Sequence, residues 1–260
     1  SGDRFFYPNV LESRGKHQRS PWFACACCPS NITRFVPQIP SYLYAVRGDS
    51  LYVNLFAAGE AEIVLNGRKV GLRQETLYPW DGAVKLTVTP EAAGEFELAV
   101  RVPGWVLGRP VPGDLYSYLE SEPAPVEILL NGSPASAAPE LGYIKFRRTW
   151  NPGDTLEVVY PMTIRRVLAN PAVVADAGRV AVERGPLVYA AEFPEHGGRV
   201  GNLVLWDDVR LATEVRKGLL GGVTIVWGDA AVVIRQAPDG TIVKRPGRIT
   251  LIPYYAWAHR

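Results

Sequence analysis

The sequence predicts a mainly β protein built from antiparallel β-sandwiches, and three observations carry that prediction. From residue 42 onward, apolar and polar residues alternate in short runs, as they do in half-buried strands. Two Asn-Gly pairs, at positions 66–67 and 131–132, each follow such a run, and this pair favours the type I′ turn of a β-hairpin. Turn residues also recur about every ten positions, which is typical of sandwiches.

The clearest expected strands lie at 51–56, 84–89 and 96–102. In each of them, alternate residues would share one face of a strand, with a period of two. The proline-rich segment 109–125 predicts an exposed excursion between strands. The first 40 residues lack sustained alternation. There, Ser30 is expected to cap a short helix over 31–36, which Pro37 ends.

Length and charge restrict the class of protein. The chain has 260 residues, enough for one or two domains, and its net charge is +2 with no long basic run. We therefore expect neither a nucleic-acid partner nor a membrane partner. No stretch is long and apolar enough to span a bilayer, and residues 1–4 lack the pattern of a signal peptide. Together with three cysteines, too few for a disulfide scaffold, this predicts a cytoplasmic enzyme, binding module or structural module.

The cysteine cluster is the most unusual chemistry in the chain. Cys25, Cys27 and Cys28 lie within four residues and are followed by Pro29. Thiolates suit zinc, but a four-ligand site would need further ligands from elsewhere. Pro29 disfavours helical angles at Cys28, so a turn that brings Cys27 and Cys28 onto one ion is expected at or before Cys27. The alternatives are free core cysteines or a strained vicinal disulfide.

Segments 5–13 and 22–31, with the Cys-x-Cys-Cys-Pro motif, resemble glycoside hydrolase family 127, the β-L-arabinofuranosidases. The resemblance continues through most of the chain, at 51–55, 73–76, 78–82, 101–105, 169–171, 183–189 and 252–258. It implies an (α/α)6 barrel followed by two β-sandwiches. Residues 1–41 would then be the last segment of the barrel, 49–151 an inserted middle sandwich, and 42–48 plus 152–260 the C-terminal sandwich.

The resemblance also implies roles for the cysteines. Cys27 would be both the nucleophile of a retaining glycosidase and a zinc ligand, and Cys28 would be a second ligand, whereas Cys25 would not bind zinc. Another cysteine and a glutamate, which complete the zinc site, and a glutamate acid/base would lie upstream of this chain. The chain alone is therefore expected to be inactive and to bind zinc weakly or not at all. Ser30 departs from the family pattern, in which many relatives have a second proline. Pro37 and Pro40 interrupt a stretch that is usually more helical and put the helix after the motif in question.

Two other interpretations stay open at this point. One is a non-catalytic carbohydrate-binding or structural β-sandwich module, and the other is a structural zinc or redox-sensing cysteine site on an unrelated β protein. The intact cysteine motif favours the enzyme, whose partner would be a carbohydrate substrate. A homo-oligomer is left open. Three further candidates have structural explanations: His17 in an exposed loop, Glu75 and Asp81 at a strand end and an Asp-Gly turn, and Glu183 with Arg184 as an ion pair.

Overall fold

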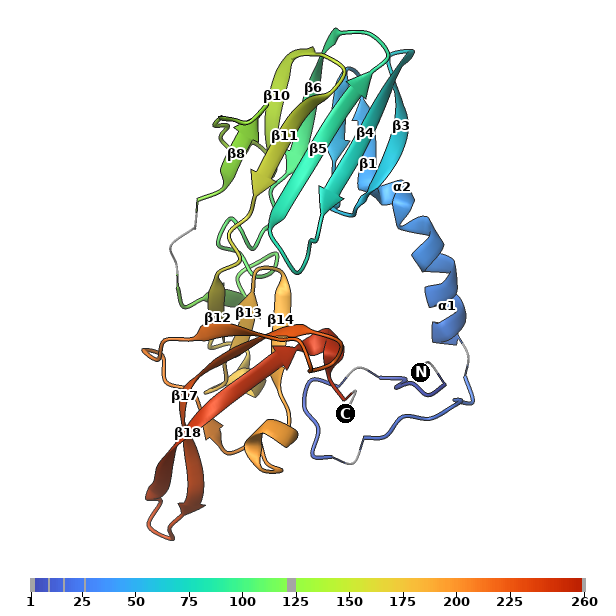
Figure 1. Cartoon of the computed structure of the whole chain (residues 1–260). Coiled ribbons are helices and arrows are strands. Elements are labelled where there is room, and N and C mark those ends of the chain that lie inside the picture. Colours follow the sequence, from blue (N-terminus) through green and yellow to red (C-terminus); the bar gives the residue numbers. More distant parts are fainter. Residues whose placement is uncertain (1–2, 9, 16, 26, 121–124, 259–260) are drawn as a thin grey trace.

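The computed structural model describes residues 3–8, 10–15, 17–25, 27–120 and 125–258. Strands make up 46% of it and helices 10%, which confirms the mainly β class. Two β units lie one above the other, and a helical segment runs along one side of the molecule (Figure 1). No helix among the described residues is long and apolar enough to cross a membrane.

The first β unit is a sandwich of a four-stranded and a six-stranded sheet. The four-stranded sheet has the order β1 (Tyr44–Arg47), β2 (Ser50–Val53), β6 (Gly94–Arg101), β10 (Tyr143–Trp150). The six-stranded sheet has the order β3 (Gly59–Leu65), β4 (Arg68–Thr76), β5 (Ala83–Pro90), β11 (Asp154–Val159), β8 (Glu127–Leu130), β9 (Ser133–Pro134). Every pair is antiparallel except β2 and β6, which run parallel.

The predicted alternation places the core of this sandwich. Val84, Leu86 and Val88 of β5 are buried, as are Phe96, Leu98 and Val100 of β6. The alternation expected over 51–56 ends early, because β2 stops at Val53 and leaves Leu55 exposed. Both Asn-Gly turns are confirmed: φ is 49° at Asn66 and 50° at Asn131, and positive at the following glycines.

The second β unit is one eight-stranded antiparallel sheet. Seven strands have the order β15 (Leu203–Val204), β17 (Val223–Gln236), β18 (Ile242–Pro253), β14 (Leu187–Ala191), β13 (Ala181–Arg184), β12 (Ile164–Ala169), β7 (Tyr116–Tyr118). The eighth, β16 (Ala212–Arg216), pairs with β17. Three 3₁₀ turns accompany them: η2 (Val174–Asp176), η3 (Pro194–His196) and η4 (Tyr254–Ala256). The long β17–β18 hairpin projects from the sheet (Figure 1).

Strand pairing differs from the sequence-based division into 49–151 and 42–48 plus 152–260. β1 forms a hairpin with β2, and β11 pairs with β5 and β8, so both belong to the first unit. β7, from the expected excursion, pairs instead with β12 of the second unit. Backbone hydrogen bonding to the nearest free strand edge, which the sequence does not display, decides these memberships.

A helical segment connects residue 27 to the first sandwich. It consists of α1 (Cys27–Phe35), the 3₁₀ turn η1 (Val36–Gln38) and α2 (Pro40–Leu43). The helix begins four residues earlier than the expected 31–36, and Cys28 is helical although Pro29 follows it. Pro29, Pro37 and Pro40 all lie in the first turn of their segments, where a helix does not need the missing N–H.

Candidate active site at the cysteine cluster

The three cysteine thiols and the hydroxyl of Tyr7 form one hydrogen-bonded cluster, which we call the thiol cluster. Tyr7 Oη lies 3.0 Å from Cys27 Sγ and accepts a hydrogen bond from Cys28 Sγ at 3.2 Å. Cys25 Sγ donates to Cys27 Sγ at 3.3 Å, and the sulfurs of Cys27 and Cys28 are 3.8 Å apart. All three thiols are free and exposed, so the interpretation as core cysteines is wrong.

Tyr7 is a member of this cluster that the sequence did not single out. Its hydrogen bonds with Cys27 and Cys28 are the largest causes that raise the pKa of Tyr7 above its ordinary value. The hydroxyl therefore stays protonated at neutral pH and remains available as a donor to a sulfur. Tyr7 lies 20 positions before Cys27, and no local pattern connects two residues at that separation.

A short aromatic bridge brings Tyr7 to the start of α1. Phe5 and Ser20 exchange two backbone hydrogen bonds of 3.0 Å, which fold the N-terminal segment back on itself. The ring of Phe23 then packs between those of Phe5 and Tyr7, at centroid distances of 5.3 and 5.2 Å. This segment therefore positions the Tyr7 hydroxyl over the sulfurs.

The same segment is anchored to the second β unit. The rings of Phe6 and Trp257 stack at 4.6 Å, and the Tyr254 hydroxyl donates to the Val10 carbonyl at 2.9 Å. Glu12 and Arg179 form an ion pair of 2.7 Å, which lowers the pKa of Glu12. The thiol cluster is thus joined covalently to the first unit through α1 and α2 and is held non-covalently by the second (Figure 1).

His17, considered from the sequence, lies in this anchor and not among the sulfurs. Its ring stacks on Phe6 at 4.8 Å and also faces Trp257.

The carboxylates considered from the sequence have structural roles, as expected. Glu75 pairs with Arg73, and Asp81 Oδ1 accepts the Ala83 N–H at 2.8 Å. Glu183, half-buried, accepts the Tyr118 hydroxyl at 2.7 Å in place of the expected pairing with Arg184.

Two of the sulfurs fit a zinc ion. Two thiolates bound to one tetrahedral zinc at about 2.3 Å each lie about 3.8 Å apart. The sulfurs of Cys27 and Cys28 have this separation, whereas Cys25 Sγ is closer to Cys27 Sγ than such a pair allows. Across the described ranges, no group of three or more histidine, cysteine or acidic side chains has an arrangement that would hold a metal. The cluster therefore has two sulfurs at the separation of a zinc-bound pair and, among the described residues, no third ligand beside them.

The helical segment that carries the cluster exposes an apolar face. α1 buries none of its residues. The large exposed apolar side chains of the segment from α1 to α2 are those of Ile32, Phe35, Val36, Ile39 and Tyr42. An amphipathic helix normally gains its stability by burying such a face. The described residues leave this one uncovered.

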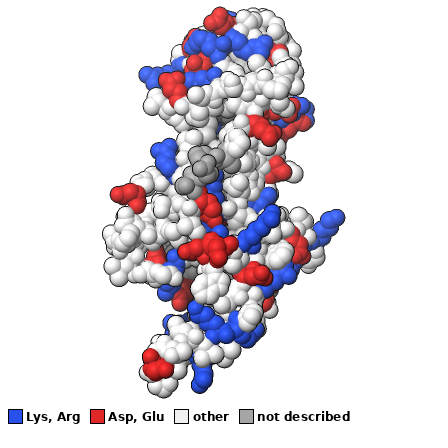
Figure 2. All heavy atoms as spheres, turned by 90° about the vertical axis from the view of Figure 1, so that its left-hand side faces the viewer, with Lys and Arg blue, Asp and Glu red and all other residues white. Residues whose placement is uncertain are grey.

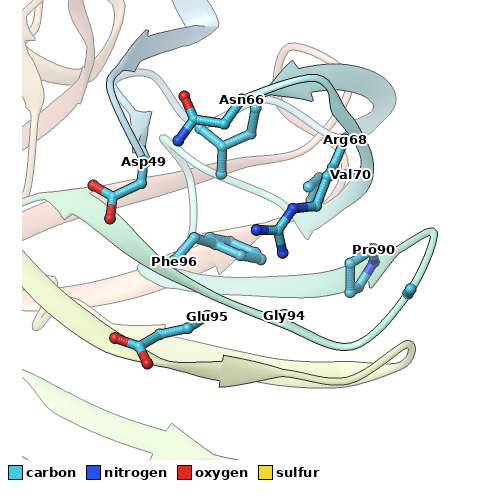
Figure 3. A pocket seen from close by; sticks show the side chains of 10 residues that line it. Asp49, Asn66, Arg68, Val70, Pro90, Gly94, Glu95 and Phe96 are labelled. Atoms are coloured by element: carbon cyan, nitrogen blue, oxygen red, sulfur yellow. The ribbon is translucent and has the colours of Figure 1, made fainter.

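A separate depression lies at the end of the first sandwich that is farthest from the second unit (Figures 1 and 3). Asp49, Asn66, Arg68 and Glu95 bring polar groups to it, above the buried ring of Phe96. Asp49 is already held by two hydrogen bonds from Arg147, and this pairing lowers the pKa of Asp49. We assign the depression no role in chemistry.

On the face shown in Figure 2, acidic and basic side chains are interspersed over both units.

Comparisons with known proteins match the whole chain to one family. Residues 1–41 match the family model described as the GH127 β-L-arabinofuranosidase catalytic domain, 50–162 the GH127 middle domain, and 164–260 the GH127 C-terminal domain. A curated relative, the non-reducing end β-L-arabinofuranosidase of Bifidobacterium longum subsp. longum, is 33% identical. That alignment covers 100% of this chain and 41% of the relative.

Solved structures agree in fold over the full chain. The GH127 β-arabinofuranosidase BT3674 superposes with a TM-score of 0.91 at 44% identity, covering 100% of this chain and 40% of the other. A GH127 β-L-arabinofuranosidase from Geobacillus stearothermophilus T6 gives 0.85 at 36% identity, covering 100% and 41%. The chain thus spans about two fifths of the length of these relatives.

Proposed function

Because the chain belongs to glycoside hydrolase family 127, we propose that it forms part of a retaining glycoside hydrolase that releases L-arabinofuranose from β-L-arabinofuranosides. The names of the curated and solved relatives support this substrate class. The thiol cluster at the start of α1 is the observation that carries the proposal. A non-catalytic carbohydrate-binding or structural module has no use for three exposed thiols around one hydroxyl.

In this proposal, Cys27 is the nucleophile. α1 begins at Cys27, which places its sulfur at the start of the helix and 3.8 Å from the sulfur of Cys28. The Tyr7 hydroxyl oxygen accepts a hydrogen bond from the Cys28 thiol, so its own hydrogen is free to be donated to Cys27 Sγ and to hold that sulfur in place. The sulfur attacks the anomeric carbon while the bond to the leaving oxygen breaks, and water then displaces the sulfur. A glutamate acid/base upstream of this chain completes the reaction.

Cys27 and Cys28 are the residues of this chain that would hold zinc. When bound, zinc would keep the nucleophile deprotonated at neutral pH. The 3.8 Å separation of the two sulfurs supports this assignment. The other two ligands, a cysteine and a glutamate, would come from upstream. A cytoplasmic location, which suits free thiols, and a homo-oligomeric state stay predictions.

The test uses the full-length enzyme that contains this chain and a haloacetamide derivative of L-arabinofuranose. We expect the reagent to label Cys27 and Cys27→Ser to lose nearly all activity, because a serine hydroxyl stays protonated. Cys25→Ser is the matched control and should retain activity. The 260-residue chain alone should not turn over a chromogenic β-L-arabinofuranoside, because general acid/base help is worth about 10²–10⁴ in rate. Labelling of a carboxylate, with Cys27→Ser still active, would contradict the proposal.

A further inference from the structure

The role of Cys25 is not explained by the proposed reaction, and its position in the thiol cluster assigns it one. We propose that Cys25 and Cys27 form a reversible disulfide when the protein meets a hydroperoxide, with Cys27 oxidised first and Cys25 resolving it. The assignment of the bond stands on geometry alone. Its consequence, that oxidation blocks the nucleophile, rests on the proposed function.

Distance and direction both favour this pair. The sulfurs of Cys25 and Cys27 are 3.3 Å apart, whereas those of Cys27 and Cys28 are 3.8 Å apart. The S–S bond of a disulfide is about 2.05 Å long, so the sulfurs of Cys25 and Cys27 have the shorter distance to move before they can bond. Cys25 also donates its S–H toward Cys27, which points the resolving thiol at the sulfur that it would attack.

Backbone freedom separates the two pairs further. Cys27 and Cys28 both lie in the first turn of α1, and a bond between them would close a small ring around one peptide unit inside the helix. Cys25 lies before the helix and has no regular secondary structure. It can therefore move toward Cys27 without unwinding α1. The predicted vicinal disulfide is the less favourable product on these grounds.

The hydrogen bonds select Cys27 as the first sulfur to react. Cys28 donates to Tyr7, which leaves the Tyr7 hydrogen free to point at Cys27, and Cys25 donates to Cys27 as well. Cys27 Sγ is thus the sulfur to which Cys25 donates and to which the Tyr7 hydroxyl is free to donate. Cys27 is also exposed, so a hydroperoxide can reach its sulfur.

The chemistry balances with a hydroperoxide as the oxidant. Cys27 sulfur attacks a peroxide oxygen; an S–O bond forms, the O–O bond breaks, and water or an alcohol leaves. Cys25 sulfur then attacks the sulfenic sulfur; the S–S bond forms, the S–O bond breaks, and water leaves with the Cys25 proton. Two thiols lose two electrons in total, and the peroxide gains them. A thiol reductant reverses the bond.

The test uses the 260-residue chain, hydrogen peroxide at a small molar excess, and iodoacetamide to block the remaining thiols. Peptide mapping should find the Cys25–Cys27 disulfide, with Cys28 alkylated, and dithiothreitol should restore three free thiols. Cys28→Ser is the matched control and should keep the disulfide. Cys25→Ser should lose it and let Cys27 proceed to the sulfinic acid. A Cys27–Cys28 bond, or an oxidised Cys27 beside an alkylatable Cys25, would overturn the assignment.

A second arm keeps this inference distinct from the proposed function. In the full-length enzyme, oxidation should release bound zinc and abolish activity together, and dithiothreitol should restore activity. In Cys25→Ser, dithiothreitol should not restore activity, because Cys27 proceeds to the sulfinic acid. If the mapped disulfide forms and activity persists, Cys27 is not the nucleophile; the proposed function then fails while the disulfide assignment stands. If activity is lost with no disulfide, the inference fails while the proposed function stands.

Discussion

Trp80 and Tyr255 join the two β units through a direct side-chain hydrogen bond. The indole N–H of Trp80, in the loop between β4 and β5, donates to the Tyr255 hydroxyl in η4 at 2.8 Å. The rings meet edge to face at 6.3 Å, and Arg184 donates to the Trp80 carbonyl at 3.2 Å. Both side chains remain half exposed, so this contact between the units lies at the surface.

This contact should be measurable as a coupling energy. Trp80→Phe and Tyr255→Phe each remove the hydrogen bond, so their effects on the free energy of unfolding should not add, with a coupling of about 1 kcal/mol. Urea unfolding of both single variants and the double variant gives the value. Trp22→Phe, at another exposed tryptophan, is the control and should change little. Strictly additive effects would show that the bond contributes nothing to stability.

Glu183 should make stability fall as pH rises. Burial raises its pKa above the ordinary 4.5, against the lowering effects of Tyr118 and Arg165. The native state then binds this proton more tightly than the unfolded state does, so the contribution is full below about pH 4.5 and is lost as pH passes the raised pKa. Glu183→Gln should remove this contribution to the pH dependence of stability. Its free energy of unfolding should therefore rise relative to that of the parent as pH rises to about 8.

Urea midpoints measured across that pH range test the effect. Glu75→Gln, which alters an exposed carboxylate, is the control and should leave the slope of the parent in place. A Glu183→Gln variant whose pH dependence equals that of the parent would show that Glu183 is not linked to folding.

The two Asn-Gly turns should differ in their tolerance of alanine. Asn66 and Asn131 have the same positive φ, so alanine costs about 1 kcal/mol of backbone strain at either position. Among the described residues, only Asn131 of the two has side-chain bonds to a neighbouring strand of its sheet: it donates to Asp154 at 3.0 Å and accepts the Thr155 N–H at 2.7 Å, both in β11. Asn131→Ala should therefore destabilise the protein by about 1–2 kcal/mol more than Asn66→Ala. Equal unfolding free energies for the two variants would refute this account.

Gly82 should not tolerate any side chain. A Cβ at this position would lie 1.9 Å from the Tyr160 carbonyl oxygen, a backbone atom that has no room to retreat. Gly82→Ala should cost about 3 kcal/mol, and the thermal midpoint should fall accordingly. Gly59→Ala is the control, because nothing lies within 4 Å of its Cβ position. A Gly82→Ala protein as stable as Gly59→Ala would contradict this packing.

The features that depend on neighbouring residues could be predicted from the sequence. The alternation of β5 and β6 and both Asn-Gly turns follow from side-chain period and turn chemistry, and the structure has them. The predicted helix start at residue 31 is wrong, because Ser30 lies inside α1 and not at its N-cap. Its hydroxyl donates back to the Cys27 carbonyl at 3.1 Å, a bond that a residue within the first turns of a helix can make.

Long-range pairings were beyond the sequence. β7 pairs with β12 at the edge of the second unit, and nothing in the sequence of residues 116–118 indicates that pairing. Tyr7 meets Cys27 only because Phe5, Ser20 and Phe23 fold the N-terminal segment back. The resemblance singled out the cysteines of the candidate site, whereas the Tyr7 hydroxyl beside them is seen only in the structure.

The anchoring of the thiol cluster also sets an order of events during synthesis. The bond from Tyr254 to Val10 joins residues 244 positions apart. At about 5–20 residues per second, a ribosome needs roughly 12–50 s to make the second after the first. For that interval the nascent cysteines have no second unit on which to dock. That interval is therefore open to a chaperone, a reductant or a metal that acts on these thiols before they dock.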